Sequence, residues 1–391
     1  MITVLIYMAL AVLTVFLAIT LYNYLTAPML RDVPPPQNPQ QYASNPLVSV
    51  LIPARNEAAN IGNCLAGLLA QNYKNMEIIV LDDHSEDKTA EIVQEFAKHY
   101  PQIHLIQGRP LPPDWTGKNW ACQQLSAAAR GIIYIFTDAD NTHAPNAVEN
   151  TVRWMQRYDL SMLSAFPQQQ TQTMPEQLAV PVVDMFVYAG LPLWLTYISP
   201  YPSLAAANGQ WIAFTRQAYI ELGGHLSVRQ HVVEDVELSR ATKSRGLRMI
   251  TTAGTDTVFC RMYNSFDSVW TGFTKNLFGL VGYSSIGFFA LLTLLFVACI
   301  LPYCTVWFAD YRWISLGAIV LNLLLRLLIS LKYKHPLLVS VLLHPVSIGF
   351  VIAIGINSFI RVKQGRIEWK NRSINTSALL KDISFEELQK S

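Results

Sequence analysis

Long apolar stretches lie toward both ends of the chain and flank a middle region with a different pattern. Residues 2–25 are almost wholly apolar and long enough to span a bilayer. Three more apolar stretches follow, at 286–308, 313–331 and 336–360. The last is interrupted at His344-Pro345, which allows a re-entrant hairpin as well as a full span.

The middle region alternates short β-branched runs with helical patterns. Ile132–Phe136 is an apolar run that ends in carboxylates, which is typical of a buried parallel strand. Similar runs lie at 47–53, 76–81, 103–107 and 159–165. Helical patterns separate the runs that begin at residues 47, 76, 103 and 132. This alternation predicts an α/β domain with a mainly parallel sheet.

These patterns divide the chain into six segments. They are an N-terminal transmembrane anchor (1–26), a linker rich in Pro, Gln and Asn (27–46), the α/β domain (47–262), an interfacial helix region (263–285), C-terminal membrane segments (286–360) and a basic tail (361–391). Arg31 favours a cytosolic α/β domain. Three full C-terminal spans would then put the basic tail outside, so we expect that one of them does not cross completely.

Composition supports a membrane protein. Hydrophobic residues make up 51% of the chain and charged residues only 14%, against roughly 25% charged residues in an ordinary soluble domain. The net charge of +2 gives no sign of a nucleic-acid surface. The five cysteines are scattered, so they indicate neither a disulfide framework nor a zinc site.

Polar clusters follow the predicted strands at their carboxyl ends, where parallel sheets collect ligands. The clusters are Arg55 with Glu57, Asp82 with Asp83, and Asp138 with Asp140. A buried carboxylate is unfavourable unless it is paired or binds a cation, and a divalent cation held for a diphosphate is one solution. A polar strand end leading into a turn is the alternative for Asp138 and Asp140. For Asp82 and Asp83, hydrogen bonds to a base or ribose compete with helix capping.

Three further stretches carry candidate chemistry. Lys118 lies near the start of a predicted helix, where it meets a phosphate or is an ordinary solvated lysine. Residues 205–211 are small and polar and precede a predicted strand at 212–214. Glu234 and Asp235 begin another predicted helix, where acidic residues are also normal capping chemistry.

Several of these motifs resemble a known family. The run Val48–Glu57 (VSVLIPARNE), followed by Val80–Thr89 (VLDDHSEDKT), resembles the opening of a family 2 glycosyltransferase with the GT-A fold. Asp138-Ala139-Asp140 matches the DxD motif of that family. Trp115-Thr116-Gly117-Lys118 and Trp369-Lys370-Asn371-Arg372 are similar to membrane members associated with carotenoid and hopanoid glycosylation. The resemblance covers roughly residues 47–276.

The resemblance implies a role for each matching position. Asp140, with Asp138, would hold Mg²⁺ or Mn²⁺ against the diphosphate of a nucleotide-sugar, with a UDP-sugar favoured. Asp235 would be the general base of an inverting transferase, and Glu234 would position the acceptor or Asp235. The expected nucleotide-sugar contacts are Pro53, Arg55, Glu57, Asp82, Asp83, Lys118, Asp138 and Ala139, and the expected sugar and acceptor contacts are Asn208, Gly209, Gln210 and Trp211.

The apolar segment 174–199 bears on how a lipid could reach this site. If it crossed the membrane, the carboxylates at 138 and 140 would face one side and those at 234 and 235 the other. We therefore expect an interfacial or re-entrant segment, with a buried core hairpin as the alternative.

One departure from the family narrows the reaction. Processive polysaccharide synthases of the family carry Gln-x-x-Arg-Trp after the base, and this chain does not. We therefore expect transfer of a single sugar to a lipid-soluble acceptor at the cytosolic membrane face, with a carotenoid- or hopanoid-like hydroxyl or carboxyl favoured. The expected location is a multi-pass protein of the bacterial inner membrane that contacts membrane lipids and no nucleic acid.

Other functions remain as alternatives. A polyprenyl phosphate or a glycerolipid is the other acceptor class. A non-catalytic subunit that binds nucleotide-sugars should have lost Asp140 or Asp235, and both are present. A transporter should show inverted repeats, and a dinucleotide enzyme a Gly-x-Gly-x-x-Gly after its first strand, and neither is visible.

Overall fold

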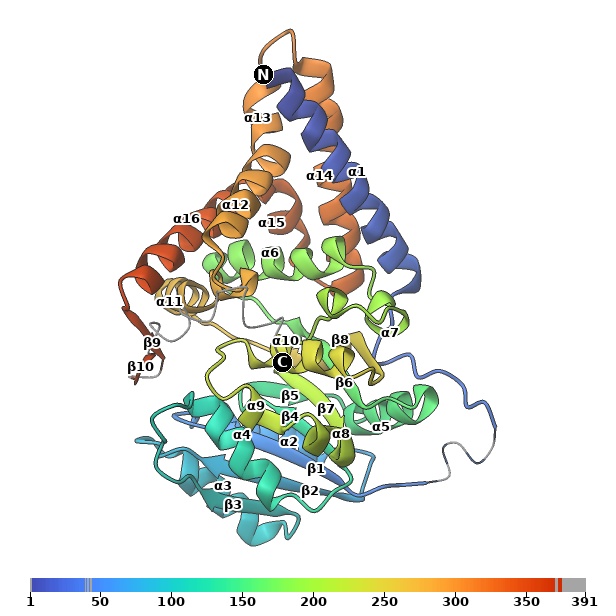
Figure 1. The fold of residues 1–391 in the computed structure, drawn as a ribbon, viewed down its shortest axis with the longest axis vertical. Coiled ribbons are helices and arrows are strands. Elements are labelled where there is room, and N and C mark those ends of the chain that lie inside the picture. Colours follow the sequence, from blue (N-terminus) through green and yellow to red (C-terminus); the bar gives the residue numbers. More distant parts are fainter. Residues whose placement is uncertain (1, 39, 41, 43, 370–371, 375–391) are drawn as a thin grey trace. The chain divides into compact units, whose positions relative to one another are not determined.

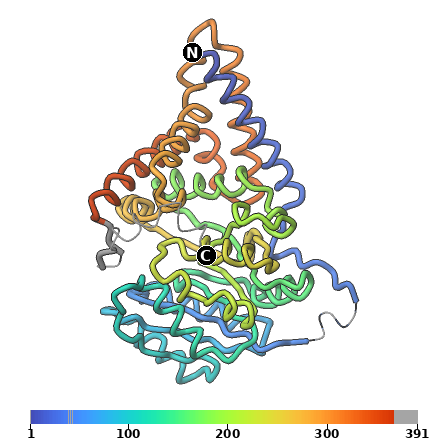
Figure 2. The backbone as a smooth tube through the Cα atoms, viewed as in Figure 1, coloured from blue at the N-terminus to red at the C-terminus, as the bar shows by residue number. Residues whose placement is uncertain are grey.

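The computed structural model describes residues 2–38, 40, 42, 44–369 and 372–374, which fall into two compact units (Figures 1 and 2). The sheet unit comprises residues 26–170 and 192–262, and the helical unit comprises residues 1–25, 171–191 and the chain from 263 onward. Lys370 and Asn371 of the 369–372 motif, and the basic tail from 375, lie outside the described residues.

An eight-stranded mixed sheet forms the centre of the sheet unit, in the order β3-β2-β1-β4-β7-β6-β8-β5. The strands β3, β2, β1 and β4 are parallel, as are β6 and β8, whereas β7 and β5 are antiparallel to their neighbours. The strands are β1 (Val48–Ala54), β2 (Met76–Asp82), β3 (Ile103–Gln107), β4 (Ile133–Thr137), β5 (Asn141–His143), β6 (Met162–Gln169), β7 (Trp211–Thr215) and β8 (Met249–Cys260).

In the parallel half of the sheet, the strands lie where the sequence predicts them. In the other half, the order of the strands in the sheet does not follow their order in the chain. β6, expected as the fifth parallel strand, is separated from β4 by β7, which comes some forty residues later in the chain and pairs antiparallel with both. The sheet is therefore mainly parallel but mixed. This insertion brings the residues just before β7 beside the carboxyl end of β4.

Helices cover both faces of the sheet because its central strands are apolar on both faces. Val50 and Ile52 of β1 pack into one core cluster with α2, α3 and α5, and Leu51 packs into the other with α4, α8 and α10. The helices of this unit are α2 (Ile61–Leu69), α3 (Thr89–His99), α4 (Gly117–Ala128), α5 (Ala147–Tyr158), α7 (Leu195–Ile198), η1 (Pro202–Leu204), α8 (Arg216–Glu221), α9 (Gly224–Ser227) and α10 (Glu234–Ser244).

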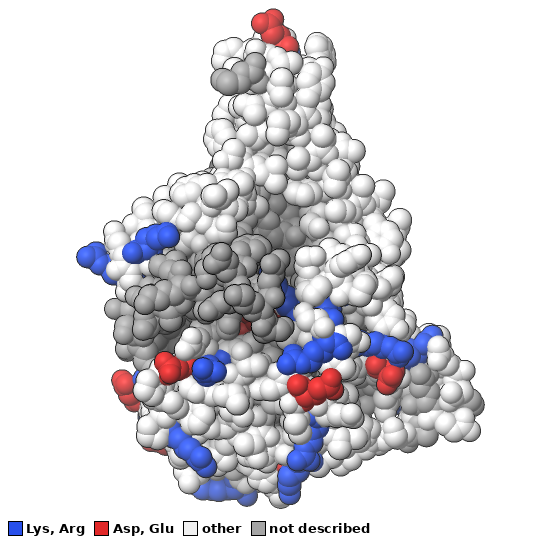
Figure 3. All heavy atoms as spheres, in the orientation of Figure 1, with Lys and Arg blue, Asp and Glu red and all other residues white. Residues whose placement is uncertain are grey.

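The helical unit contains three helices long and apolar enough to cross a membrane among the described residues: α1 (Ile2–Thr26), α14 (Arg312–Tyr333) and α16 (His344–Lys363). Its other elements are α6 (Met174–Gly190), α11 (Phe266–Asn276), η2 (Gly279–Val281), α12 (Ser285–Cys299), α13 (Leu301–Thr305), α15 (Leu337–Leu342), β9 (Ile367–Trp369) and β10 (Arg372–Ile374). On the face in Figure 3, the surface over α1 and α12–α14 is nearly free of charge, as expected for helices in contact with lipid.

Two of the predicted apolar stretches are interrupted. The stretch 286–308 is not one helix: it breaks at Ile300, before Pro302, and α12 forms a 111° bent pair with the preceding segment Phe266–Val281. Pro302 lacks the N–H that would continue the helix. The stretch 336–360 breaks at Leu343, next to the predicted interruption at His344-Pro345.

Arg326 explains how the second break is tolerated inside an apolar unit. Its side chain is fully buried, and its Nε donates to the carbonyl oxygen of Ser340 at 3.1 Å. That carbonyl is among the last four of α15, which have no partner within their own helix. Nη1 of Arg326 donates to the carbonyl oxygen of Pro181 in α6 at 2.9 Å. The guanidinium therefore caps one helix and contacts another.

The apolar segment 174–199 is divided between the units. Its first part is α6, which is not among the helices able to cross a membrane. The two acidic residues of α6 are both partnered. Glu176 closes a capping box with Thr173, and Asp184 lies 3.1 Å from Nε2 of His335. Trp194 and Tyr197, in the second part, pack against Tyr158 of α5 in the sheet unit.

Candidate active site

A pocket lies at the carboxyl ends of β1 and β4 in the sheet unit. Its polar wall combines side chains from three elements: Lys118 at the start of α4, Asp138 after β4, and Glu234 and Asp235 at the start of α10. Gly209, from the loop before β7, completes that wall. The remaining wall is formed by Pro53, Cys122, Phe136, Ile212, His225 and Leu238.

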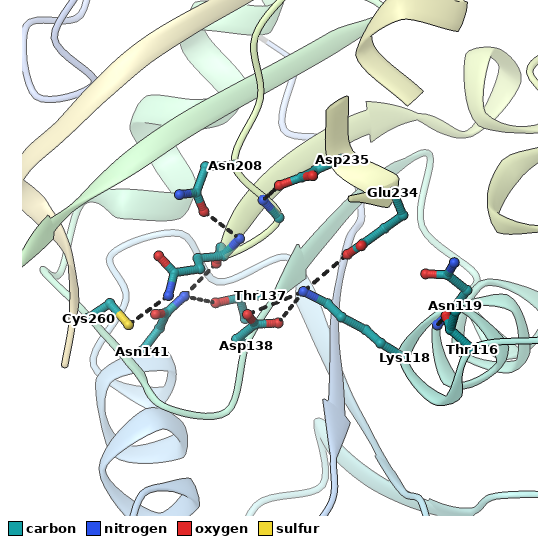
Figure 4. Close-up of polar contacts among 12 residues, drawn as sticks. Thr116, Lys118, Asn119, Thr137, Asp138, Asn141, Asn208, Glu234, Asp235 and Cys260 are labelled. Carbon is teal, nitrogen blue, oxygen red and sulfur yellow. Dashed lines mark hydrogen bonds and ion pairs between the residues drawn. The ribbon is translucent and has the colours of Figure 1, made fainter. Parts of the chain in front are cut away.

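Lys118 joins two of the predicted acidic clusters. Its Nζ lies 2.9 Å from Oδ1 of Asp138 and 3.2 Å from Oε1 of Glu234 (Figure 4). Burial opposes the charge of the ammonium, but the two carboxylates outweigh it and raise the pKa of Lys118 well above its usual value. α4 begins at this point because Thr116 caps it, with its side chain accepting from the backbone N–H of Asn119.

Asp235 is held by two backbone donors. The N–H of Gly209 donates to Oδ2 at 2.7 Å and the N–H of Val236 donates to Oδ1 at 2.9 Å. Burial and the adjacent carboxylate of Glu234 raise the pKa of Asp235 to about 7, against the lowering effect of Lys118 and the two N–H groups. The carboxylate is therefore fixed in position, and its pKa lies close to neutral pH. A general base requires both properties.

The DxD motif places two carboxylates after β4. Asp138 faces the pocket, and Asp140 shares a hydrogen bond with the thiol of Cys260 at the end of β8. Among the described residues, no group of three or more His, Cys, Asp and Glu side chains is arranged to hold a metal. Two carboxylates fit a Mg²⁺-like ion, because such ions take one or two protein carboxylates and complete their shell with phosphates and water.

The predicted nucleotide residues lie at the ends of β1 and β2. Nη1 of Arg55 donates to the carbonyl oxygens of Asp83 and His84, at 2.7 and 3.1 Å, so this arginine organises the loop after β2. Glu57 accepts from the side-chain amide of Asn60 at 2.9 Å. Asp82 is buried, and its Oδ1 accepts no hydrogen bond from any described residue. An unsatisfied buried oxygen is unusual and calls for a donor from outside the chain.

Of the four residues predicted to line the sugar and acceptor pocket, only Gly209 does so. Asn208 accepts from the backbone N–H of Gln210 and shapes the turn. The side chain of Gln210 is buried and donates to the sulfur of Cys260. Trp211 is fully buried, and its indole N–H donates to Thr151 of α5 at 3.0 Å. The alternation along β7 turns the side chain of Trp211 into the core and away from this pocket.

His225 and Cys122 line the pocket and were not predicted. Cys122 follows Lys118 by four residues in α4, so helical spacing could have placed it on the same face. His225 is buried against Phe136, and its Nδ1 lies 2.6 Å from the hydroxyl of Tyr219. Burial, reinforced by the charge of Lys118, lowers the pKa of His225 to about 3, so the imidazole is neutral. No sequence signal marked it beyond the preceding Gly223-Gly224 turn.

Comparison with known proteins identifies the domain. Residues 49–175 match the model of the family described as glycosyl transferase family 2. The chain carries a family 2 glycosyltransferase domain. The mannosyltransferase PcManGT from Pyrobaculum calidifontis, solved with GDP-Man and Mn²⁺, shares the GT-A fold with a TM-score of 0.55 at 19% identity, covering 90% of this chain and 98% of that one.

Two relatives of this chain carry the same name. The 4,4'-diaponeurosporenoate glycosyltransferase of Staphylococcus aureus (strain bovine RF122 / ET3-1) is 27% identical over 343 residues, which cover 84% of this chain and 88% of that protein. That of Staphylococcus haemolyticus (strain JCSC1435) is 30% identical over 250 residues, covering 61% and 62%. The likeness to the first relative therefore extends well beyond the residues that match the family model.

Proposed function

We propose that this glycosyltransferase moves one sugar, with inversion, from a nucleotide-sugar to a lipid-soluble acceptor of the carotenoid type. The observation that carries the proposal is Asp235. A carboxylate that is fixed by two backbone N–H groups and has a pKa of about 7 lies in one pocket with Asp138 of the DxD motif. A base and a diphosphate-binding carboxylate in one pocket are the two parts that an in-line displacement at the anomeric carbon needs.

The donor half of the site is assigned to the ends of β1, β2 and β4. The buried, unsatisfied Oδ1 of Asp82 is matched to an N–H or O–H donor on a nucleoside. Asp138 and Asp140 are assigned to Mg²⁺ or Mn²⁺, and the mannosyltransferase with the same fold was solved with Mn²⁺. A divalent cation bound there would act as a Lewis acid on the departing diphosphate oxygen. A UDP-sugar remains the favoured donor.

Asp235 and Glu234 are assigned to the acceptor. Asp235 takes the proton from a hydroxyl as its oxygen attacks the sugar. It can serve a carboxyl group as well, because removal from water raises the pKa of a lipid carboxylic acid and keeps it protonated. Glu234 accepts a hydrogen bond from the acceptor or orients Asp235. The relatives' name, which specifies a carotenoid acid, supports this acceptor class.

The membrane assignment rests on the helical unit. Three of its described helices are long and apolar enough to cross a bilayer, and a lipid-soluble acceptor is delivered from such an environment. We infer a multi-pass protein of the bacterial inner membrane with its sheet unit in the cytosol, where nucleotide-sugars are available. A polyprenyl phosphate is a weaker candidate acceptor, because an ionised phosphate has no proton for Asp235 to remove.

The test is a reaction of the purified full chain in lipid nanodiscs. The protein is incubated with a panel of UDP- and GDP-sugars and total bacterial membrane lipid that contains carotenoids, with and without EDTA. Mass spectrometry should show one added hexose on a lipid, and chelation should abolish it. Equal product with EDTA would remove the metal role of Asp138 and Asp140, and transfer to no lipid would overturn the proposed function.

A further inference from the structure

One ammonium in the pocket serves two carboxylates that belong to opposite halves of the site. Lys118 contacts Asp138, which we assign to the donor, and Glu234, which we assign to the acceptor. The two carboxylates come from elements almost a hundred residues apart, the end of β4 and the start of α10. Lys118 therefore connects the two halves of the site directly.

The charge balance of the pocket makes this connection necessary in the absence of substrate. Asp138, Glu234 and Asp235 all line the pocket, and Lys118 is the one cationic side chain among its described lining residues, since His225 is neutral. Closely spaced carboxylates repel one another strongly at low dielectric. Lys118 offsets that repulsion in the place where the charge of a bound cation would otherwise act.

The same charge balance changes when a divalent cation and a diphosphate enter. A cation on Asp138 repels the ammonium and makes it unnecessary there, and the diphosphate attracts it. The Lys118 side chain can respond, because it is 27% exposed and carried on a flexible four-carbon chain. Gly209 keeps the region around the ammonium open on one side, since a methyl group there would lie 3.2 Å from Nζ.

We propose that Lys118 is an exchangeable counter-cation: it holds Asp138 and Glu234 in the empty enzyme and transfers to the donor diphosphate when the metal–nucleotide complex binds. This inference rests on the proposed nucleotide-sugar function. The exchange removes the ammonium from Glu234 at the moment the donor is in place. Glu234 is then available to the acceptor only after donor binding, so Lys118 is a positioning residue that orders the two substrates.

The exchange predicts opposite effects of one substitution on two ligands. In Lys118→Met, Mn²⁺ without nucleotide should bind about 10-fold more tightly, because the competing ammonium is gone. In the presence of Mn²⁺, nucleoside diphosphate should bind about 10-fold more weakly, because the same ammonium no longer reaches the phosphates. A residue that only contacted phosphate would change the second affinity alone, and one that only supported the fold would weaken both.

The experiment uses the full chain in detergent. Binding of Mn²⁺ alone is measured by electron paramagnetic resonance, and binding of UDP and of GDP with saturating Mn²⁺ by calorimetry. Lys98→Met, at an exposed lysine of α3 paired with Glu95, is the matched control and should change neither affinity. Adding Asp138→Asn to Lys118→Met should abolish the gain in Mn²⁺ affinity. That result would place the ion at the carboxylate of Asp138 in the DxD motif.

The outcomes separate this inference from the function beneath it. If neither UDP nor GDP binds the wild-type protein with Mn²⁺, the proposed function fails and the exchange fails with it. If one of them binds but Lys118→Met leaves the affinity for Mn²⁺ alone unchanged or weaker, the exchange is wrong and the proposed function stands. Tighter binding of Mn²⁺ and weaker binding of the nucleotide in the same variant would support the exchange.

Discussion

Gly209 is a position where a small substitution should disturb the candidate active-site pocket. Its N–H donates to Asp235 at 2.7 Å, and its Cα faces the other charged groups of the pocket. A Cβ added there would lie 3.2 Å from Oε1 of Glu234, 3.2 Å from Nζ of Lys118 and 3.4 Å from Oδ2 of Asp235. Gly209→Ala therefore presses one methyl group against three charged side chains at once.

The expected size of the effect follows from these distances. Two of the contacts are closer than ordinary van der Waals separation, so Lys118 and Glu234 must move by a few tenths of an ångström. A misplacement of about 1 Å in an active site reduces the rate on the order of 100-fold, so we expect kcat/KM to fall about 5- to 20-fold, or ~1–2 kcal/mol. Stability should change by less than about 1 kcal/mol, because the backbone of Gly209 is not left-handed and alanine restricts the unfolded chain.

Product formation measured by mass spectrometry over a range of donor concentrations gives kcat/KM, and thermal unfolding gives stability. Gly62→Ala in α2 is the control, since a Cβ there would meet a side-chain carbon of Ile92 in α3 at an ordinary 4.0 Å. It should leave kcat/KM at the wild-type value and raise stability by up to about 1 kcal/mol, because alanine is the better helix former. A Gly209→Ala variant with wild-type kcat/KM would refute the close packing of Lys118, Glu234 and Asp235 around this glycine.

Three further predictions concern protonation and stability. With the pKa of Asp235 raised to about 7 by burial and by Glu234, its base form is lost as the pH falls, so kcat/KM should fall about tenfold per unit below pH 7. A profile that stays flat from pH 5 to 8 would contradict this. Burial opposes ionisation of Glu77, but hydrogen bonds from Ser49 and Arg130 prevail and lower its pKa. The ionised carboxylate of Glu77 therefore stabilises the fold at pH values above the pKa that this group has in the unfolded chain. That stabilisation is lost as the pH falls through the lower pKa of Glu77 in the folded protein. Glu77→Gln should cost about 2 kcal/mol in chemical denaturation at pH 7, with a smaller difference in acid, and an equal difference at both pH values would argue against it. Arg326→Met leaves the carbonyl of Ser340 uncapped and should destabilise the helical unit by about 2–3 kcal/mol in detergent, with Arg326→Lys intermediate; an unchanged melting temperature would exclude the capping role.

The polar strand ends were predictable because strand, turn and carboxylates are all local in sequence. β1, β2 and β4 are short apolar runs, and Asp82 and Asp138 follow from where those runs stop. The DxD motif is local in the same way, whereas the Glu234–Asp235 pair lies at the start of a predicted helix. That they lie in one pocket is implied by the family resemblance. In the structure, Lys118 contacts both Asp138 and Glu234 and so links the two motifs.

The rest depends on pairings that sequence pattern does not specify. The insertion of β7 between β4 and β6 is a long-range choice, and it turns Trp211 into the core while Gly209 faces the pocket. His225 had no signal of its own because a buried neutral histidine and a pocket histidine look alike in sequence. The break at Ile300 was missed because hydrophobicity alone does not register the effect of Pro302 on helix continuity.

The most direct test of the account is the activity of Asp235→Asn. The substitution keeps the shape of the side chain but removes its ability to accept a proton. Asp159→Asn is the matched control, at an exposed left-handed position that asparagine tolerates. With a nucleotide-sugar donor and a lipid that carries a hydroxyl or protonated carboxyl, we predict a loss of product of about 10²- to 10⁴-fold for Asp235→Asn and none for Asp159→Asn. Transfer by Asp235→Asn at the wild-type rate to the same lipid would contradict the assignment of Asp235 as the base.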